Sequence, residues 1–181
     1  MLLPKPIMKK IKERKLNRMR GFDYSQVGHY FVTICSKNRE CYFGDVVNDE
    51  MKLNQCGKTA DLFWRNIPIH FPNIDLDAFI VMPNHMHGII IVGNNENPVG
   101  NNDRCFLHPI SNNRNMELIP KILSQYKSSV SREMRKKYDD FEFKWQKSFY
   151  DHIIRDEQSL NNIREYIINN PIKWAMDRKK S

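Results

Sequence analysis

Apolar residues along this 181-residue chain recur at two different spacings, which predict strands separated by amphipathic helices. Aromatic and β-branched residues dominate positions 29–35, and positions 73–81 and 85–92 share this strand character. Pro83-Asn84 separates the last two stretches and predicts a tight turn. Two further features complete the predicted strands: a short hairpin around Asn48-Asp49, and a last strand over 141–154.

Three other stretches carry apolar residues at helical spacing. The first runs from Asn54 to about Ile69, with Asn54 as its expected cap. The second runs from about residue 119 to 137 and has a basic flank. The third is expected to begin near Ser159, as its cap, and to run toward Pro171. The chain is therefore predicted to belong to the mixed α/β class.

The chain is long enough for one domain with a full core, which we assign to residues 21–177. Within it, the asparagine-rich stretch 93–115 predicts a long flexible loop. Residues 1–20 are expected to form a basic arm and residues 178–181 a basic tail. Because no stretch has the pattern of a signal peptide or a membrane span, a soluble cytoplasmic protein is expected. The four cysteines form no Cys-x-x-Cys pair, so neither a disulfide framework nor a zinc knuckle is indicated.

Positive charge is concentrated at the start of the chain. The net charge is +8, and the first twenty residues contribute +7 of it, because eight lysines and arginines there face one glutamate. Such an arm suits a polyanion such as nucleic acid, although a solvated tail would have the same composition. The residues expected to contact DNA phosphates are Lys9, Lys10, Lys12, Arg14, Lys15, Arg18 and Arg20 in the arm, and Lys127 and Arg132 in the second helix.

Two histidines, His85 and His87, begin the strand that follows the predicted turn. Side chains two apart on a strand point the same way, so both imidazoles face one point in space. Imidazole is the commonest side-chain metal ligand, and a strand holds two of them rigidly. The alternative is a pair of half-buried polar residues with no ligand, and the His-x-His pattern alone does not decide between the two.

The last helix places a phenol and an amide on one edge. At 100° per residue, Tyr166 and Asn170 lie together beside the buried stripe of the helix. From the helix alone, the simpler interpretation is that Tyr166 lies at the rim of the core and that Asn170 caps the helix before Pro171.

Taken together, these motifs resemble the HUH single-tyrosine transposases, and most closely the REP-associated tyrosine transposases. The resemblance extends over most of residues 21–175. The stretches that carry it are Gly21-Phe22-Asp23-Tyr24-Ser25, Tyr30-Phe31-Val32-Thr33-Ile34-Cys35, Val81-Met82-Pro83-Asn84-His85-Met86-His87-Gly88, Tyr126-Lys127-Ser128-Ser129, Trp145-Gln146-Lys147-Ser148-Phe149-Tyr150-Asp151-His152 and Tyr166-Ile167-Ile168-Asn169-Asn170-Pro171.

The resemblance implies a ferredoxin-like fold with a central antiparallel sheet and helices packed on one face. It also implies a divalent ion, Mg²⁺ or Mn²⁺, held by His85, His87 and Asn170, and Tyr166 as the catalytic nucleophile. Related insertion-sequence transposases usually have a glutamine as the third ligand, and Asn170 departs from them while matching the REP-associated branch. The implied reaction is cleavage of single-stranded DNA at hairpins through a 5′-phosphotyrosine, followed by strand joining.

Two other functions are compatible with parts of this pattern. One is a domesticated, inactive DNA- or RNA-binding module on the same scaffold, against which the intact histidines, tyrosine and asparagine argue. The other is a rolling-circle replication initiator or relaxase, whose chains are usually larger and carry more ligands. The sequence leaves open whether the protein is a monomer or a homodimer.

Overall fold

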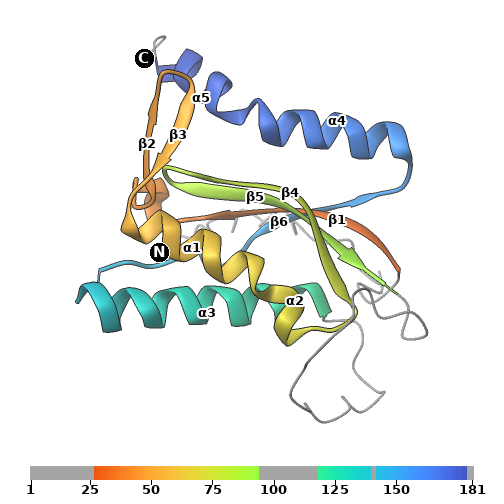
Figure 1. The fold of residues 1–181 in the computed structure, drawn as a ribbon, viewed down its shortest axis with the longest axis horizontal. Helices are drawn as coiled ribbons and strands as arrows, with labels where there is room; N and C mark the ends of the chain where they lie inside the picture. The colour runs from red at the N-terminus through yellow and green to blue at the C-terminus, as the bar shows by residue number, and fades with distance from the viewer. Residues whose placement is uncertain (1–26, 94–117, 140–141, 179–181) are drawn as a thin grey trace, which may run out of the picture.

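The computed structural model describes residues 27–93, 118–139 and 142–178. Its four main strands form one antiparallel sheet in the order β4-β5-β1-β6 (Figure 1). These strands are β1 (Gly28–Cys35), β4 (Ile74–Met82), β5 (His85–Val92) and β6 (Tyr150–Ile154). Between β1 and β4 the chain forms a small hairpin and then helix α1, and between β5 and β6 it forms helix α3. This order and pairing are those of a ferredoxin-like fold, so the predicted fold class is confirmed.

The helices are divided between the two faces of the sheet (Figure 1). Helices α1 (Gln55–Arg65), α2 (Ile67–His70) and α3 (Leu118–Tyr138) cover one face and enclose the larger core. Helix α4 (Glu157–Ile168) packs on the opposite face. The expectation that the helices pack on one face therefore holds for α1–α3 and is wrong for α4. The physical reason is that alternation along β1 and β5 places Phe31 and Ile89 on the second face, where α4 buries them.

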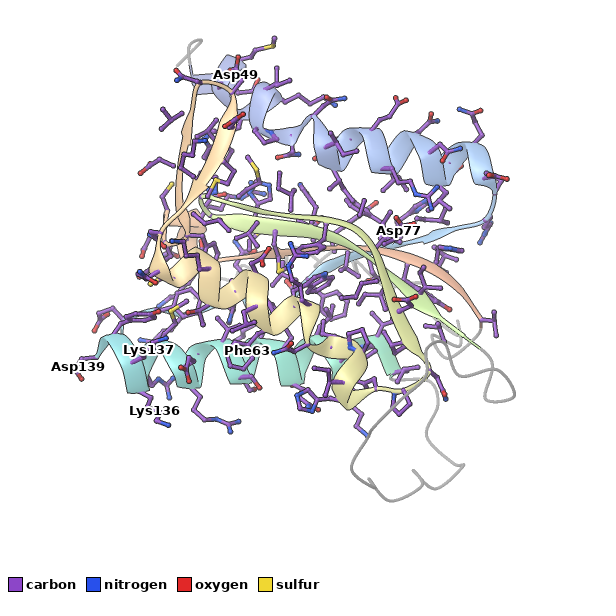
Figure 2. All side chains as sticks on the ribbon, in the orientation of Figure 1. Asp49, Phe63, Asp77, Lys136, Lys137 and Asp139 are labelled. Atoms are coloured by element: carbon purple, nitrogen blue, oxygen red, sulfur yellow. The ribbon has the colours of Figure 1, made fainter. Side chains whose placement is uncertain are left out.

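The remaining elements are η1 (Lys37–Arg39), the hairpin β2 (Gly44–Val47) and β3 (Glu50–Leu53), and α5 (Asn170–Arg178). Both hairpin turn residues, Asn48 and Asp49, adopt positive φ, as a two-residue hairpin turn requires, and Asp49 lies at the tip of the hairpin in Figure 2. Asn54 caps α1 by accepting a hydrogen bond from the N–H of Gly57 at 2.9 Å. These three sequence predictions, the hairpin, its turn and the cap, are confirmed.

Two predicted boundaries are wrong. The last strand covers Tyr150–Ile154 rather than 141–154, because the preceding segment makes only an isolated bridge, between Trp145 and Ser36, while Phe143 and Trp145 pack with Phe43 in an aromatic cluster. The last helix begins at Glu157, and its cap is Asp156 rather than Ser159, because Asp156 accepts a hydrogen bond from the Ser159 N–H at 2.7 Å.

Several predictions fall on residues outside the described ranges. These are the basic arm 1–20, residues 94–115 of the predicted loop, Cys105, and residues 179–181 of the tail. Within the described ranges, no helix is both long and apolar enough to cross a membrane.

Candidate active site

The two histidines are placed by the start of β5, directly after the Pro83-Asn84 turn. Their strand lies close under α1, because Gly88 has no side chain: a Cβ atom there would come within 2.4 Å of the Trp64 ring. His85 and His87 point to the sheet face opposite α1, the face that α4 covers. The glycine that follows the His-x-His pattern thus lets a helix on one face support a site on the other.

The ring nitrogens of the two histidines converge. Nε2 of His85 lies 3.1 Å from Nε2 of His87, and the two residues are only 8% and 5% exposed. Desolvation by burial lowers the pKa of His85 to about 4 and that of His87 to about 3. Both imidazoles are therefore neutral at pH 7, which is the form that binds metal ions.

A second set of residues fixes the orientation of each ring. Asn84 donates from Nδ2 to the Arg39 carbonyl at 2.9 Å, which turns its Oδ1 toward Nδ1 of His85 at 2.7 Å. Because that oxygen can only accept, His85 carries its proton on Nδ1 and presents the Nε2 lone pair to the site. Thr33, the cross-strand partner of His87, places its hydroxyl 2.8 Å from Nδ1 of that ring. The Thr33 hydroxyl can accept or donate, so it is compatible with a proton on Nδ1 of His87, and the two Nε2 atoms are directed at one point.

Tyr166 reaches this point from α4. Its hydroxyl oxygen lies 3.3 Å from Nε2 of His87, and its ring packs edge-on against Phe31 at a centroid distance of 6.1 Å. Phe31 also stacks on the ring of His87 at 5.4 Å, so one side chain supports both groups. The ammonium of Lys173, on α5, lies 4.7 Å from the centroid of the Tyr166 ring. Tyr166 remains 38% exposed, so a large substrate can approach it.

Asn170 lies at the junction of α4 and α5 rather than inside one continuous helix. It is 6% exposed, and its side chain is hydrogen-bonded to His85. The structure thus brings together all four residues that the sequence places in one site, Tyr166, His85, His87 and Asn170.

An ion pair anchors α4 to the sheet. The guanidinium of Arg164 donates to Asp77 on β4 through Nε and Nη2, with the shortest contact at 2.6 Å. Asp77 lies between the sheet and α4 in Figure 2. Hydrogen bonding to Arg164 lowers the pKa of Asp77 even though partial burial opposes the shift. Since Tyr166 follows Arg164 by two residues, this pair fixes the part of α4 that carries the phenol.

The donor set fits a divalent ion. Two neutral imidazole nitrogens converge, and the buried amide of Asn170 lies beside one of them. In the part of the chain that the structure describes, no group of three or more histidines, cysteines and carboxylates could hold a metal. A site here would therefore rest on the two histidines and an amide.

The predicted DNA contacts lie elsewhere. Lys127 and Arg132 are on α3, across the sheet from Tyr166, and the predicted contacts of the arm are outside the described residues. Sequence reasoning missed Thr33, Asn84 and Lys173. Only Asn84 could have been found, since it precedes His85 in the turn, whereas Thr33 depends on strand register and Lys173 on the bend between α4 and α5.

Comparison with known proteins identifies relatives over most of the chain. No family model matches the chain. An uncharacterized protein of Haemophilus influenzae is 38% identical over 173 residues, which are 93% of each chain. A second protein of that organism, provisionally named a REP-associated tyrosine transposase, is 26% identical over 83% of this chain and 74% of its own length. The solved structure of a REP-associated tyrosine transposase bound to a REP hairpin shares the fold, with a TM-score of 0.53 at 18% identity over 87% of this chain and 74% of that one.

The chain is thus similar over most of its length to a protein provisionally named a REP-associated tyrosine transposase, and it shares the fold of a solved member of that family. This similarity supports a transposase-like role and an enzyme of the tyrosine transposase kind.

Proposed function

We propose that this protein is a REP-associated tyrosine transposase, a metal-dependent single-stranded DNA endonuclease and strand transferase that acts at DNA hairpins through Tyr166. The observation that carries the proposal is the convergence of three atoms: the Tyr166 hydroxyl lies 3.3 Å from Nε2 of His87, which lies 3.1 Å from Nε2 of His85. This arrangement supports phosphoryl transfer to a tyrosine, because a phenol is a weak nucleophile and the two neutral imidazoles could hold an ion that activates the phosphate.

His85, His87 and Asn170 would hold the divalent ion, Mg²⁺ or Mn²⁺. When bound, such an ion supplies Lewis acidity that makes the phosphorus more electrophilic and stabilises the leaving oxygen. Imidazole nitrogens suit Mn²⁺ better than Mg²⁺, which prefers oxygen ligands. We therefore expect tighter binding of Mn²⁺ than of Mg²⁺.

In the first step, the phenolic oxygen of Tyr166 attacks the scissile phosphorus. The new bond joins this oxygen to the phosphorus, and the bond from phosphorus to the 3′ oxygen breaks, which gives a 5′-phosphotyrosine and a free 3′-hydroxyl. The phenol loses one proton to solvent and the departing 3′ oxygen gains one, so the step releases no net proton. Lys173 beside the ring and Phe31 beneath it hold the phenol for this attack.

In the second step, a 3′-hydroxyl attacks the phosphotyrosine, restores a phosphodiester and frees Tyr166. Because the covalent bond conserves the energy of the broken phosphodiester, joining needs no nucleotide triphosphate. Hydrolysis alone would not require a tyrosine nucleophile.

The test is incubation of the protein with single-stranded DNA that contains a hairpin, followed by denaturing electrophoresis. With Mn²⁺ or Mg²⁺, the wild type should cut the strand and form a covalent adduct, and chelation should abolish both. Tyr166→Phe should form neither. The matched control is Tyr150→Phe, because Tyr150 is 50% exposed on the same sheet face and also packs against Phe31.

The same experiment separates the proposal from its alternative. An inactive nucleic-acid-binding module would retain hairpin binding and give no cleavage with any divalent ion. An adduct that persists in Tyr166→Phe and disappears in Tyr150→Phe would identify Tyr150, on β6, as the nucleophile instead.

A further inference from the structure

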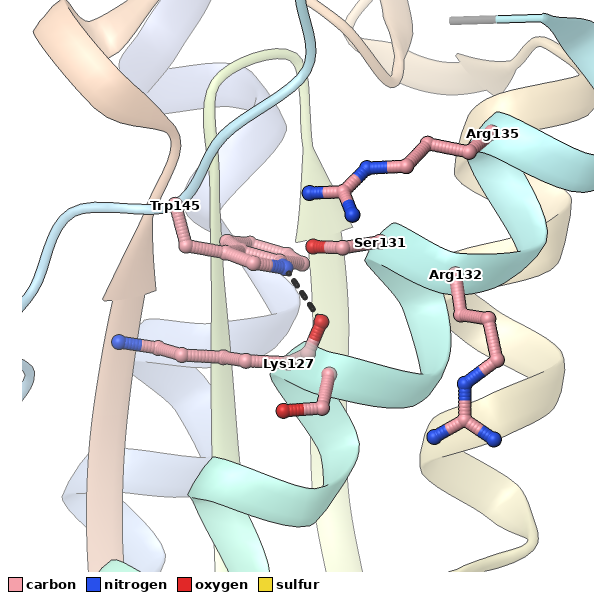
Figure 3. A pocket seen from close by; sticks show the side chains of 6 residues that line it. Lys127, Ser131, Arg132, Arg135 and Trp145 are labelled. Carbon is pink, nitrogen blue, oxygen red and sulfur yellow. Dashed lines mark hydrogen bonds between the residues drawn. The ribbon is translucent and has the colours of Figure 1, made fainter. Parts of the chain in front are cut away.

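A basic groove lies along α3, on the sheet face opposite the candidate active site (Figure 3). Its volume is about 370 Å³. The residues that line it are Lys127, Ser128, Ser131, Arg132, Arg135 and Trp145. Five of the six come from one side of α3, so a single rigid helix presents three cations and two hydroxyl groups.

Two of these cations are available to a ligand. Arg132 and Arg135 are exposed, and neither forms a hydrogen bond or ion pair with another residue in the described ranges. Lys127 differs, because its ammonium donates to the carbonyl oxygens of Gln146 and Ser148 at 2.8 and 3.2 Å. Lys127 therefore mainly fastens the segment before β6 to α3, and the two guanidinium groups carry the free charge of the groove.

The shape of the groove favours a phosphate backbone over exposed bases. Its aromatic wall, Trp145, donates from its indole N–H to the Lys127 carbonyl at 3.2 Å and packs its ring against Tyr126, Phe43 and Phe143. A ring packed in this way is not free to stack on bases, whereas proteins that bind single strands depend on such stacking. Guanidinium and hydroxyl groups, in contrast, are the usual ligands of phosphate oxygens.

We propose that this groove, defined by Ser128, Ser131, Arg132 and Arg135, binds the phosphate backbone of the duplex stem of the hairpin. The proposal rests on the proposed function and adds the place where the uncut part of the DNA is held. From Ser128 to Arg135 the helix rises about 10 Å, which spans about three phosphates of one strand at 3.4 Å of axis per phosphate. The segment that follows Trp145 enters β6, whose Tyr150 lies on the catalytic face, so the groove borders the sheet edge around which the strand would pass.

The test measures hairpin affinity at several salt concentrations. All proteins carry Tyr166→Phe and are assayed without divalent ions, so that the result does not depend on cleavage. The groove variant is Arg132→Gln with Arg135→Gln. The matched control is Lys136→Gln with Lys137→Gln, which removes the same charge from exposed positions on α3 that do not line the groove (Figure 2).

Two phosphate contacts on a duplex contribute about 1.8 to the slope of log affinity against log salt. Between 50 and 200 mM salt, the parent protein should therefore lose about 12-fold more affinity than the groove variant. The control should keep a slope close to that of the parent. Equal slopes for the parent and the groove variant, or an equal loss in the control, would overturn the proposal.

Two further measurements show whether a change in the slope comes from lost charge and which part of the DNA is bound. Arg132→Lys with Arg135→Lys preserves the charge and should recover most of the slope, and a circular dichroism melt of each variant checks that it is folded. A blunt hairpin that consists of stem and loop alone should show the same difference between parent and variant as a hairpin with a single-stranded flank. A difference that appears only with the flank would mean that the groove holds single-stranded DNA, which contradicts the proposal.

Discussion

Thr33 provides the sharpest test of how the histidines are positioned. Its hydroxyl oxygen lies 2.8 Å from Nδ1 of His87, whose Nε2 faces the candidate metal position. If Nε2 presents its lone pair to an ion, Nδ1 carries the proton and donates it to Thr33. The substitution Thr33→Val removes this acceptor while preserving the branched shape that suits β1.

Two effects of this substitution can be estimated. Loss of the partner of a metal-binding histidine typically lowers metal affinity by about 10- to 100-fold, or about 1.4–2.7 kcal/mol. His87 is only 5% exposed, so its Nδ1 has little access to water in place of the lost partner. An unsatisfied buried polar group costs about 1–3 kcal/mol of unfolding free energy. Thr33→Val should therefore weaken both metal binding and stability, and Thr33→Ser should recover most of each.

The assay is a calorimetric titration of Mn²⁺ into DNA-free protein at pH 7.5, together with urea unfolding. The matched control is Thr59→Val. Thr59 is buried and, like Thr33, has a hydrogen-bonded hydroxyl, which contacts the Gln55 carbonyl and Tyr138, but it lies on the other side of the sheet. The control should lose stability and keep its Mn²⁺ affinity. Mn²⁺ affinity of Thr33→Val within twofold of the wild type would refute the reasoning.

Three further outcomes are expected. Burial lowers the pKa of His85 to about 4 and that of His87 to about 3, so below pH 6.5 the unfolded chain binds protons that the metal-free folded protein does not. The free energy of unfolding, measured with urea, should therefore fall as the pH is lowered from 6.5 to 4. The substitution His87→Gln should make this fall smaller. A cation beside an exposed aromatic ring contributes about 0.5–1 kcal/mol, so Lys173→Met should slow single-turnover cleavage by Tyr166 about two- to fivefold, and Lys173→Arg should not. Asp77→Asn, which breaks the ion pair of α4 with β4, should lower the melting temperature more than Lys52→Gln, which breaks a more exposed pair.

Much of the fold could be predicted because its information is local. The aromatic and β-branched stretches of β1, β4 and β5 and the helical stripes of α1 and α3 can be recognised directly in the sequence. The last strand was overestimated because Phe143 and Trp145 have strand composition but pack with Phe43, which lies about a hundred residues earlier. The resemblance implies that α4 shares the face of the other helices, and periodicity does not correct this, because it reveals which side of a helix is apolar and not which face of a sheet receives it.

In the candidate site, too, local features could be predicted from the sequence and tertiary contacts could not. His85, His87, Tyr166 and Asn170 could be singled out from spacing and resemblance, and the structure brings them together. Thr33 could not, because its contact with His87 depends on the antiparallel register between β1 and β5. The sequence predicts only part of the α3 groove. The basic flank of the helix can be recognised from the sequence, but whether a cation is free to bind a ligand depends on its tertiary contacts, which differ between Lys127 and Arg132.

The measurement that tests the central claim most directly is the position of the covalent bond to DNA. The protein would be incubated with Mn²⁺ and single-stranded hairpin DNA, digested with protease and nuclease, and its nucleotide-modified peptides sequenced by mass spectrometry. We predict a nucleotide joined through its 5′-phosphate to Tyr166, no such peptide in Tyr166→Phe, and an unchanged yield in Tyr150→Phe. Modification of Tyr150 or of a histidine in place of Tyr166, or cleaved DNA with no modified peptide, would contradict the account.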